Sequence, residues 1–257
     1  MPQILSHQFF AEDLLLSEKI KNLITKKPHY FLGAQGGDIL FLYSPKTSRK
    51  SNLGLSLHNL KIEEVTHLIK EKKEKGEDVS YLVGFLSHLI LDESIHPYVY
   101  ALEKILKEEN REKDNYHYLI GSDLDLYFLE KLKGKKKRDY SYPNYLGYLN
   151  YKKLKNDLNS LLTLVNGEFK VKEKRLEIVI KLYFFINNKI TYDQKRLRRS
   201  IYFVEEKLNL SHRLSYLIKR GKYNLSFEEK NKKYYDFAPL DLFALAKDTT
   251  LKLLEEV

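Results

Sequence analysis

Apolar side chains recur every three or four positions along most of this chain, which is the spacing of one buried face of an α-helix. In the first segment, Ser6 is a candidate N-cap for a helix that reaches about residue 26 and that Pro28 ends. Residues 29–57 then hold a glycine-rich turn, GAQGGDI, and a loop rich in Ser and Pro, SPKTSRKSN. A second helix is predicted for residues 61–75, where Gly76 ends the pattern.

The third predicted helix contains the longest apolar run of the chain. Asp78 or Ser80 is its candidate cap, and it is expected to end near His96 because Pro97 restricts the residue before it. Further helices are predicted for residues 115–132, 152–165, 172–187, 193–208 and 239–257. The run IVIKLYFFI would also suit a strand, but the helical pattern on both sides of it favours a helix. The pattern therefore predicts an all-α fold.

Composition narrows the chemistry that such a fold can carry. The 257 residues are 43% hydrophobic, enough for a substantial core, and include no cysteine. Disulfides, thiolate nucleophiles and thiolate zinc sites are excluded, so any transition metal must be held by His, Asp or Glu, which suit Zn²⁺, Mn²⁺ or Fe²⁺. The first residues lack the basic and apolar regions of a signal peptide, and no apolar run approaches the ~18 residues of a membrane span. We therefore expect a cytoplasmic protein without a transmembrane segment.

The net charge of +10 is concentrated in two basic runs, KLKGKKKR at residues 131–138 and KRLRR at residues 195–199. The simpler interpretation is solvated surface. The functional interpretation is attraction of an anionic partner, such as a phospholipid surface, a phosphate ester or nucleic acid. Because the runs lack interleaved aromatic residues for base stacking, nucleic acid is the less favoured partner.

The strongest candidate for chemistry is the stripe His88, Asp92 and His96, whose members are spaced four apart and share one face of a helix. Their neighbours are mostly Leu and Ile, and burying a carboxylate among these is costly unless something pairs with it. A metal ion accounts for all three residues; a buried hydrogen-bonded network is the alternative. Further candidate ligands are His7, Asp38, His58 and His117, whereas His29, His67 and His212 are expected to be surface or packing residues.

Five segments of the chain, read in order, resemble the zinc-dependent phospholipase C family and, more distantly, the S1/P1-type nucleases. They are MPQILSHQFFAEDLL with His7, YFLGAQGGDILF with Asp38, LGLSLH with His58, GFLSHLILDESIHPYVY with the stripe, and YHYLIGSDLDLYFLEK with His117. The resemblance covers roughly residues 1–130 and implies an all-α, multi-helix domain of the phospholipase C/P1 nuclease type.

The resemblance also implies a cluster of two or three Zn²⁺ ions and a reaction. The implied ligands are Asp38, His58, His88 and Asp92 for the first ion, His96 and His117 for the second, and His7, with Asp92 as a bridge, for the third. The implied activity is hydrolysis of a phosphate ester or phospholipid, with metals that activate water and stabilise the leaving oxygen. Asp38 is the candidate catalytic residue that orients or deprotonates this water.

Two departures from the family keep other functions open. The family usually has Glu four residues after the histidine at position 117, where this chain has Gly121, and the secreted phospholipases use an N-terminal Trp, which this chain lacks. One alternative is a catalytically degenerate member with a structural metal and a surface that binds an anionic partner. The other is a single-strand nuclease.

All of the candidate chemistry lies in the first half of the chain. We therefore expect residues 1–132 to form the metal-site helical core and residues 133–257 to form a C-terminal helical portion of the same domain. A domain boundary near residues 133–148 is the alternative.

Overall fold

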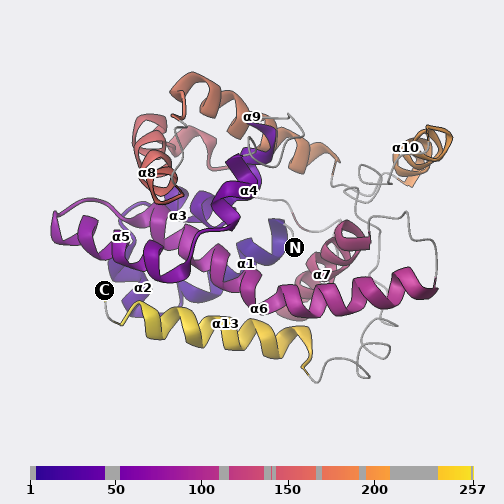
Figure 1. The fold of residues 1–257 in the computed structure, drawn as a ribbon, viewed down its shortest axis with the longest axis horizontal. Coiled ribbons are helices and arrows are strands. Elements are labelled where there is room, and N and C mark those ends of the chain that lie inside the picture. Colours follow the sequence, from indigo (N-terminus) through magenta and orange to yellow (C-terminus); the bar gives the residue numbers. More distant parts are fainter. Residues whose placement is uncertain are drawn as a thin grey trace. The chain divides into compact units, whose positions relative to one another are not determined.

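The computed structural model describes residues 4–43, 53–109, 116–135, 140, 143–165, 170–190, 195–208, 237–255 and 257. Every regular element in this part of the chain is a helix, and no strand occurs in it, so the all-α prediction is confirmed (Figure 1). The helices are α1 (Ile4–Leu14), α2 (Glu18–Leu23), α3 (Lys27–Gly33), η1 (Gly36–Leu42), α4 (Leu53–His58), α5 (Ile62–Glu74), α6 (Ser80–Glu109), α7 (Tyr116–Lys133), η4 (Leu146–Tyr148), α8 (Tyr151–Leu164), α9 (Glu173–Ile190), α10 (Lys195–Lys207) and α13 (Pro239–Leu253).

Most predicted helices lie where the apolar period placed them. Helix α5 buries Val65 and Ile69, one turn apart, and Gly76 follows it with a φ of 71°, a left-handed conformation that ends helices. Helices α7, α8, α9, α10 and α13 also match their predicted ranges to within a few residues. The run that would also have suited a strand lies inside α9, as the helical pattern around it predicted.

The predicted end of the third helix near His96 is wrong, because α6 continues through Pro97 to Glu109. Proline removes one backbone hydrogen bond from a helix interior. Here the apolar period continues on the far side, where Val99 and Leu102 are almost fully buried. Burial of this face outweighs the tendency of Pro97 to end the helix.

The first segment also differs from its prediction. The chain forms α1 and α2 in place of one helix to residue 26. Pro28 lies in the first turn of the next helix, α3, where its missing N–H costs nothing. Residues 29–57, predicted as turn and loop, include α3, η1 and α4. The Ser/Pro-rich loop at residues 44–52 falls outside the described residues, as do residues 136–138 of the first basic run.

Contacts between Cα atoms divide the chain into two compact units, which are described one at a time. The first consists of Met1–Phe9, Asp92–Tyr142 and Ile186–Ala246, and the second of Phe10–Leu91, Pro143–Phe185 and Lys247–Val257. The expected division between residues 132 and 133 stays a prediction.

In the first unit, the carboxylate of Asp125 on α7 caps the start of α1. Its oxygens accept hydrogen bonds from Leu5 N (3.1 Å), Ser6 N (2.8 Å) and the Ser6 hydroxyl (2.5 Å). The first amides of a helix have no partner within it, so a buried acceptor at this place satisfies them. Ser6 itself lies inside α1 and is not the N-cap, contrary to the prediction.

In the second unit, α3 and α6 cross so closely that only glycine fits at the crossing. A Cβ atom on Gly33 would lie 2.1 Å from the Tyr81 carbonyl oxygen, and one on Gly84 would lie 2.0 Å from that of Tyr30. Both distances are far below van der Waals contact. This crossing fixes the N-terminal half of α6 against the segment that leads into η1.

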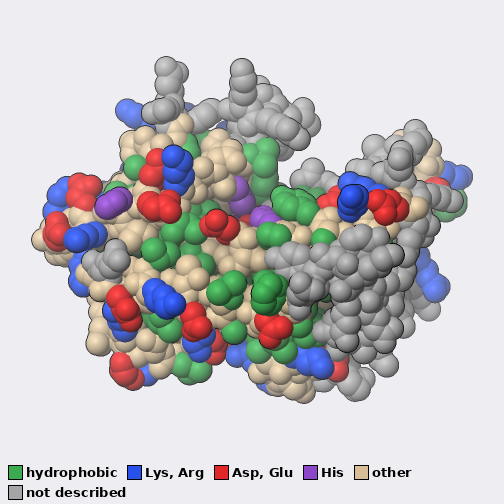
Figure 2. Space-filling view, turned by 60° about the horizontal axis from the view of Figure 1, so that its bottom comes forward, with side chains coloured by type: hydrophobic (Ala, Val, Ile, Leu, Met, Phe, Trp, Pro, Cys, Tyr) green, Lys and Arg blue, Asp and Glu red, His purple; other side chains and the backbone are tan. Residues whose placement is uncertain are grey.

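Charged side chains of both signs lie on the surface. On the face in Figure 2, Lys and Arg side chains are interspersed with Asp and Glu side chains among the described residues. Within the described parts of the chain, no helix combines the length and apolar content that crossing a bilayer requires. The cytoplasmic location stays a prediction.

Candidate metal centre

Three of the predicted ligands converge in the second unit: Asp38 from η1, His58 from the end of α4, and His88 from α6. The Nε2 atom of His58 lies 3.2 Å from Asp38 Oδ1 and 3.2 Å from His88 Nε2. One ligand atom from each of the three residues lies within 4.8 Å of the others. His88 is fully buried, while the side chains of Asp38 and His58 are about one-seventh exposed, at 15% and 14%. The cluster is therefore held by the core and open on one side.

The hydrogen bond that His58 makes through Nδ1 determines whether its Nε2 carries a proton or a lone pair. His58 Nδ1 lies 2.6 Å from the carbonyl oxygen of Gly54, which can only accept, so Nδ1 carries the proton. In a neutral imidazole, Nε2 then presents a lone pair to the carboxylate oxygen and to the second imidazole. This arrangement is unfavourable unless a cation or a proton lies between these groups, and fixing the free nitrogen through the other one is typical of metal-binding histidines.

Two glycines make room for the two imidazoles. A Cβ atom on Gly36 would lie 2.1 Å from the His88 ring, and Gly36 also has a φ of 57°, which L side chains rarely adopt. A Cβ atom on Gly37 would lie 2.7 Å from His58 Nδ1. The glycine-rich turn that the sequence predicted before Asp38 therefore lets the backbone approach both rings closely. The residues present fit a divalent cation held by nitrogen and oxygen donors.

A second pair of predicted ligands lies in the first unit. His7 Nε2 on α1 is 3.3 Å from Asp92 Oδ1 on α6, and the exposed fractions of the two side chains are 1% and 6%. His88 and Asp92 are one turn apart on the same helix, as their spacing predicted. His7 and Asp92 thus form a buried pair, although they belong to helices that are far apart in the sequence.

The last two predicted ligands, His96 and His117, also lie in the first unit and form an aromatic group with Tyr100. The ring centroids of His96 and His117 are 5.8 Å apart, and Tyr100 stacks on His96 at 5.3 Å. His117 Nδ1 lies 3.2 Å from a carboxylate oxygen of Glu103 on α6. The hydrogen bond with His117 and, less strongly, that with Lys107 lower the pKa of Glu103 to about 2 despite its partial burial.

Glu103, the partner of His117, was not among the site residues predicted from the sequence. The phospholipase C family that the sequence resembles has a ligating Glu at the position of Gly121, which is buried in α7 of this chain. Glu103 comes instead from α6, seven residues and about two turns after His96, so the helical repeat could have placed it on the same side. Glu103 lies on α6 and His117 on α7, so no local sequence pattern predicts that they pair.

We expect the substitution Glu103→Gln to weaken metal binding at His117 by about 10- to 100-fold, the usual effect of losing the carboxylate that orients a metal-binding histidine. Gln keeps the size and one acceptor oxygen but removes the charge. The measurement is a titration of the metal-free protein with zinc, followed by calorimetry. Glu93→Gln, at an exposed position of the same helix, is the control and should leave the titration unchanged. Equal titration curves for Glu103→Gln and the unmodified protein would remove Glu103 from this role.

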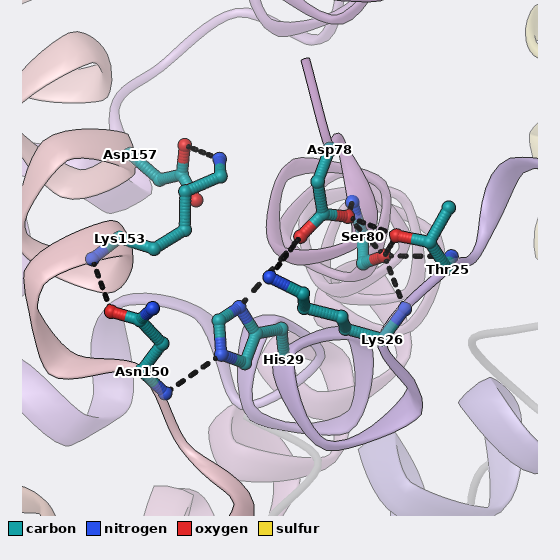
Figure 3. A network of polar contacts seen from close by, with 8 residues as sticks. All are labelled: Thr25, Lys26, His29, Asp78, Ser80, Asn150, Lys153 and Asp157. Carbon is teal, nitrogen blue, oxygen red and sulfur yellow. Dashed lines mark hydrogen bonds and ion pairs between the residues drawn. The ribbon is translucent and has the colours of Figure 1, made fainter.

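His29, expected to be a surface or packing residue, is a fully buried member of a polar network in the second unit (Figure 3). Asn150 N, at the start of α8, donates to His29 Nε2 over 3.0 Å, so His29 Nδ1 carries the proton and faces Asp78 Oδ2 at 4.0 Å. Asp78 Oδ1 accepts hydrogen bonds from the hydroxyl of Thr25 and from the amide and hydroxyl of Ser80. Within the described residues the network connects α3 with the starts of α6 and α8.

This network predicts a loss of stability in acid. Burial lowers the pKa of His29 from 6.5 to about 4, although Asp78 acts in the opposite direction. Below pH 6.5 the unfolded chain therefore takes up a proton that the folded protein does not accept until about pH 4. The free energy of unfolding should fall across this window by up to about 3 kcal/mol from this residue.

The measurement is urea unfolding at neutral pH and near the lower end of this window, for the unmodified protein and for His29→Gln. Gln can accept the bond from Asn150 N but does not titrate. The variant should lose less stability between the two pH values than the unmodified protein does. Equal losses would show that His29 is protonated in the folded protein as easily as in the unfolded chain.

Comparison of the chain with models of protein families, with curated proteins and with solved structures finds no match.

Proposed function

We propose that this protein is a zinc-dependent hydrolase of phosphate esters, similar in chemistry to phospholipase C. The observation that carries the proposal is the tautomer of His58. Its Nδ1 donates to the Gly54 carbonyl, so in the neutral imidazole the Nε2 lone pair faces Asp38 and His88 at 3.2 Å. A divalent cation is the partner that satisfies two imidazole nitrogens and a carboxylate oxygen together.

Zinc is the metal that this donor set favours. Imidazole and carboxylate ligands bind zinc at about 2.0–2.2 Å, and three protein ligands with one open position are typical of its catalytic sites. Manganese and ferrous iron accept similar ligands, so the metal content has to be measured. The cluster has three protein ligands and is partly open to solvent, which supports a catalytic over a closed structural site.

When bound, the metal would polarise a phosphoryl oxygen and lower the pKa of a coordinated water. The protein residues then have separate roles. His58 and His88 hold the site in place, the first through Gly54 and the second through its burial in α6. Asp38 offsets positive charge with one carboxylate oxygen and orients the attacking water, or accepts its proton, with the other.

The substrate class rests on the sequence resemblance and on charge. The net charge of +10 favours an anionic substrate, and the resemblance to phospholipases C points to a phosphodiester. For a phospholipid, the products would be a diacylglycerol and a phosphorylated head group. His7, Asp92, His96 and His117 are proposed to hold one or two further ions.

The test is metal content by mass spectrometry on untagged protein purified without chelators, together with turnover of phosphatidylcholine and of single-stranded DNA. Two or three zinc ions per chain with phosphatidylcholine turnover would support the proposal. Turnover of DNA alone would replace it by a nuclease. Metal-loaded protein with no turnover of either substrate would contradict it.

Gly121 supports one alternative, a degenerate family member. Without a side chain at this position, the His96 and His117 pair lacks the carboxylate on α7 that the family uses. This alternative predicts at most one tightly held ion, and no hydrolysis.

A further inference from the structure

Helix α9 carries an apolar stripe on its outer face. Ile178, Leu182 and Phe185 are 65%, 43% and 60% exposed, although all three are large hydrophobic side chains. Their spacing of four and three residues places them in one row along the helix, about 11 Å long. Single exposed hydrophobic residues are normal on protein surfaces, but an aligned row of three on one helix is less common and points to a contact.

The stripe cannot turn inward, because the opposite face of α9 is already packed. The buried residues of that face are Leu176, Val179, Ile180, Tyr183 and Phe184. The Tyr183 hydroxyl donates to Gln35 Oε1 over 2.9 Å in the interior, and the Lys172 amide donates to the Tyr43 hydroxyl over 2.9 Å. These bonds fix both the rotation of α9 and its attachment to the residues on either side of η1, which carries Asp38.

Basic residues border the stripe on both sides. With 100° per residue, Lys174 and Lys181 project to one side of Ile178, and Arg175 projects to the other. All three are exposed, and Arg175 lies over the ring of Tyr43 at 4.7 Å. The acidic residues of this part of the helix are Glu173, 3.8 Å from Lys155, and Glu177, which accepts from Lys181 over 2.6 Å.

We propose that α9 docks the protein onto the surface of an anionic phospholipid bilayer. Ile178, Leu182 and Phe185 enter the boundary between head groups and acyl chains, while the basic side chains extend toward lipid phosphates. An apolar face bordered by Lys and Arg is the pattern of helices that lie in the membrane interface, since long basic side chains can extend to the head groups while their stems pack on apolar surface.

A bilayer fits this surface better than a protein partner does. A stable protein interface usually buries about 800 Å² on each side, and three side chains in a row supply only part of such an area. A bilayer requires no shape complementarity, and its negative surface potential attracts Lys and Arg. The inference does not depend on the metal centre, so binding is expected with and without bound metal.

The first test is co-sedimentation of the full chain with vesicles of phosphatidylcholine alone and of phosphatidylcholine mixed with phosphatidylserine. We expect binding to the mixed vesicles, reduced at least about tenfold by the combined substitution of Ile178, Leu182 and Phe185 by Ser. These positions are exposed, so the variant should fold. The matched control is Leu16→Ser with Leu245→Ser, two residues that are also exposed, at 71% and 55%, on other helices or turns. The control variant should bind as the unmodified protein does.

A second test uses the absence of tryptophan from the chain. In the variant Leu182→Trp, the only indole reports the environment of the stripe, and its emission should shift to shorter wavelength when mixed vesicles are added. Leu16→Trp should show no shift. Two results would overturn the proposal: equal binding of the Ser variant and its control, or no binding of the unmodified protein to the mixed vesicles. A dimer in solution that the Ser variant dissociates would then assign the stripe to contact between two copies of the chain.

Discussion

Replacing Asp38 by Asn is expected to weaken metal binding at the centre by about 100-fold or more and to lower the proposed phosphate-ester hydrolysis about a thousandfold. Asn has the size of Asp and keeps one oxygen, but it lacks the negative charge. The Asp38 carboxylate lies 3.2 Å from His58 Nε2, which in turn lies 3.2 Å from His88 Nε2, so the variant removes the only anion of this ligand set. Zinc affinity is measured by competition with a coloured chelator, and hydrolysis with a chromogenic phosphodiester at saturating zinc.

A second variant tests the same centre without removing a ligand. Gly36→Ala places a methyl group where the His88 ring lies and demands a backbone conformation that Ala disfavours, so the imidazole must move. We expect it to lower zinc affinity as Asp38→Asn does. Asp13→Asn is the control, because Asp13 lies in the same unit but pairs with Lys247 at 2.8 Å. If Asp38→Asn and Asp13→Asn bind zinc equally well, Asp38 does not take part in metal binding.

The sequence predicted most of the helices, because they depend on local spacing. That Asp38, His58 and His88 bind a metal stays a prediction. His88 and Asp92 share a face of α6 since four residues make about one turn. The turn before Asp38 was recognised by its glycines, and the structure gives two of them a reason, since a side chain at either position would meet an imidazole ring. The approach of Asp38, His58 and His88 is a tertiary result that spacing alone could not supply.

The parts that the sequence did not predict depend on partners distant along the chain. The carbonyl of Gly54 determines the tautomer of His58, but any residue has a carbonyl, so the sequence holds no signal for it. Glu103 meets His117 only because α6 continues past Pro97, which local preference argued against. His29 was expected to be a surface or packing residue. It is buried, and its polar partners come from the residues just before α6 and from the start of α8.

The second large effect is expected from replacing Asp125, whose carboxylate caps the start of α1. Asp125→Ala is expected to lower the free energy of unfolding by about 3–5 kcal/mol, because it leaves the amides of Leu5 and Ser6 and the Ser6 hydroxyl without their buried acceptor. Asp125 and Ser6 are fully buried, so water cannot replace the lost bonds without opening the packing. The measurement is urea unfolding followed by circular dichroism.

Two milder variants separate the charge of Asp125 from its hydrogen bonds. Ser6→Ala removes only the hydroxyl donor and should cost about 1 kcal/mol. Asp125→Asn keeps one acceptor oxygen and should fall between Ser6→Ala and Asp125→Ala. Because α1 carries His7, the Ala variant should also loosen the pairing of His7 with Asp92, which lies 3.3 Å away in the same unit. A loss below about 1 kcal/mol for Asp125→Ala would mean that the start of α1 does not depend on this carboxylate.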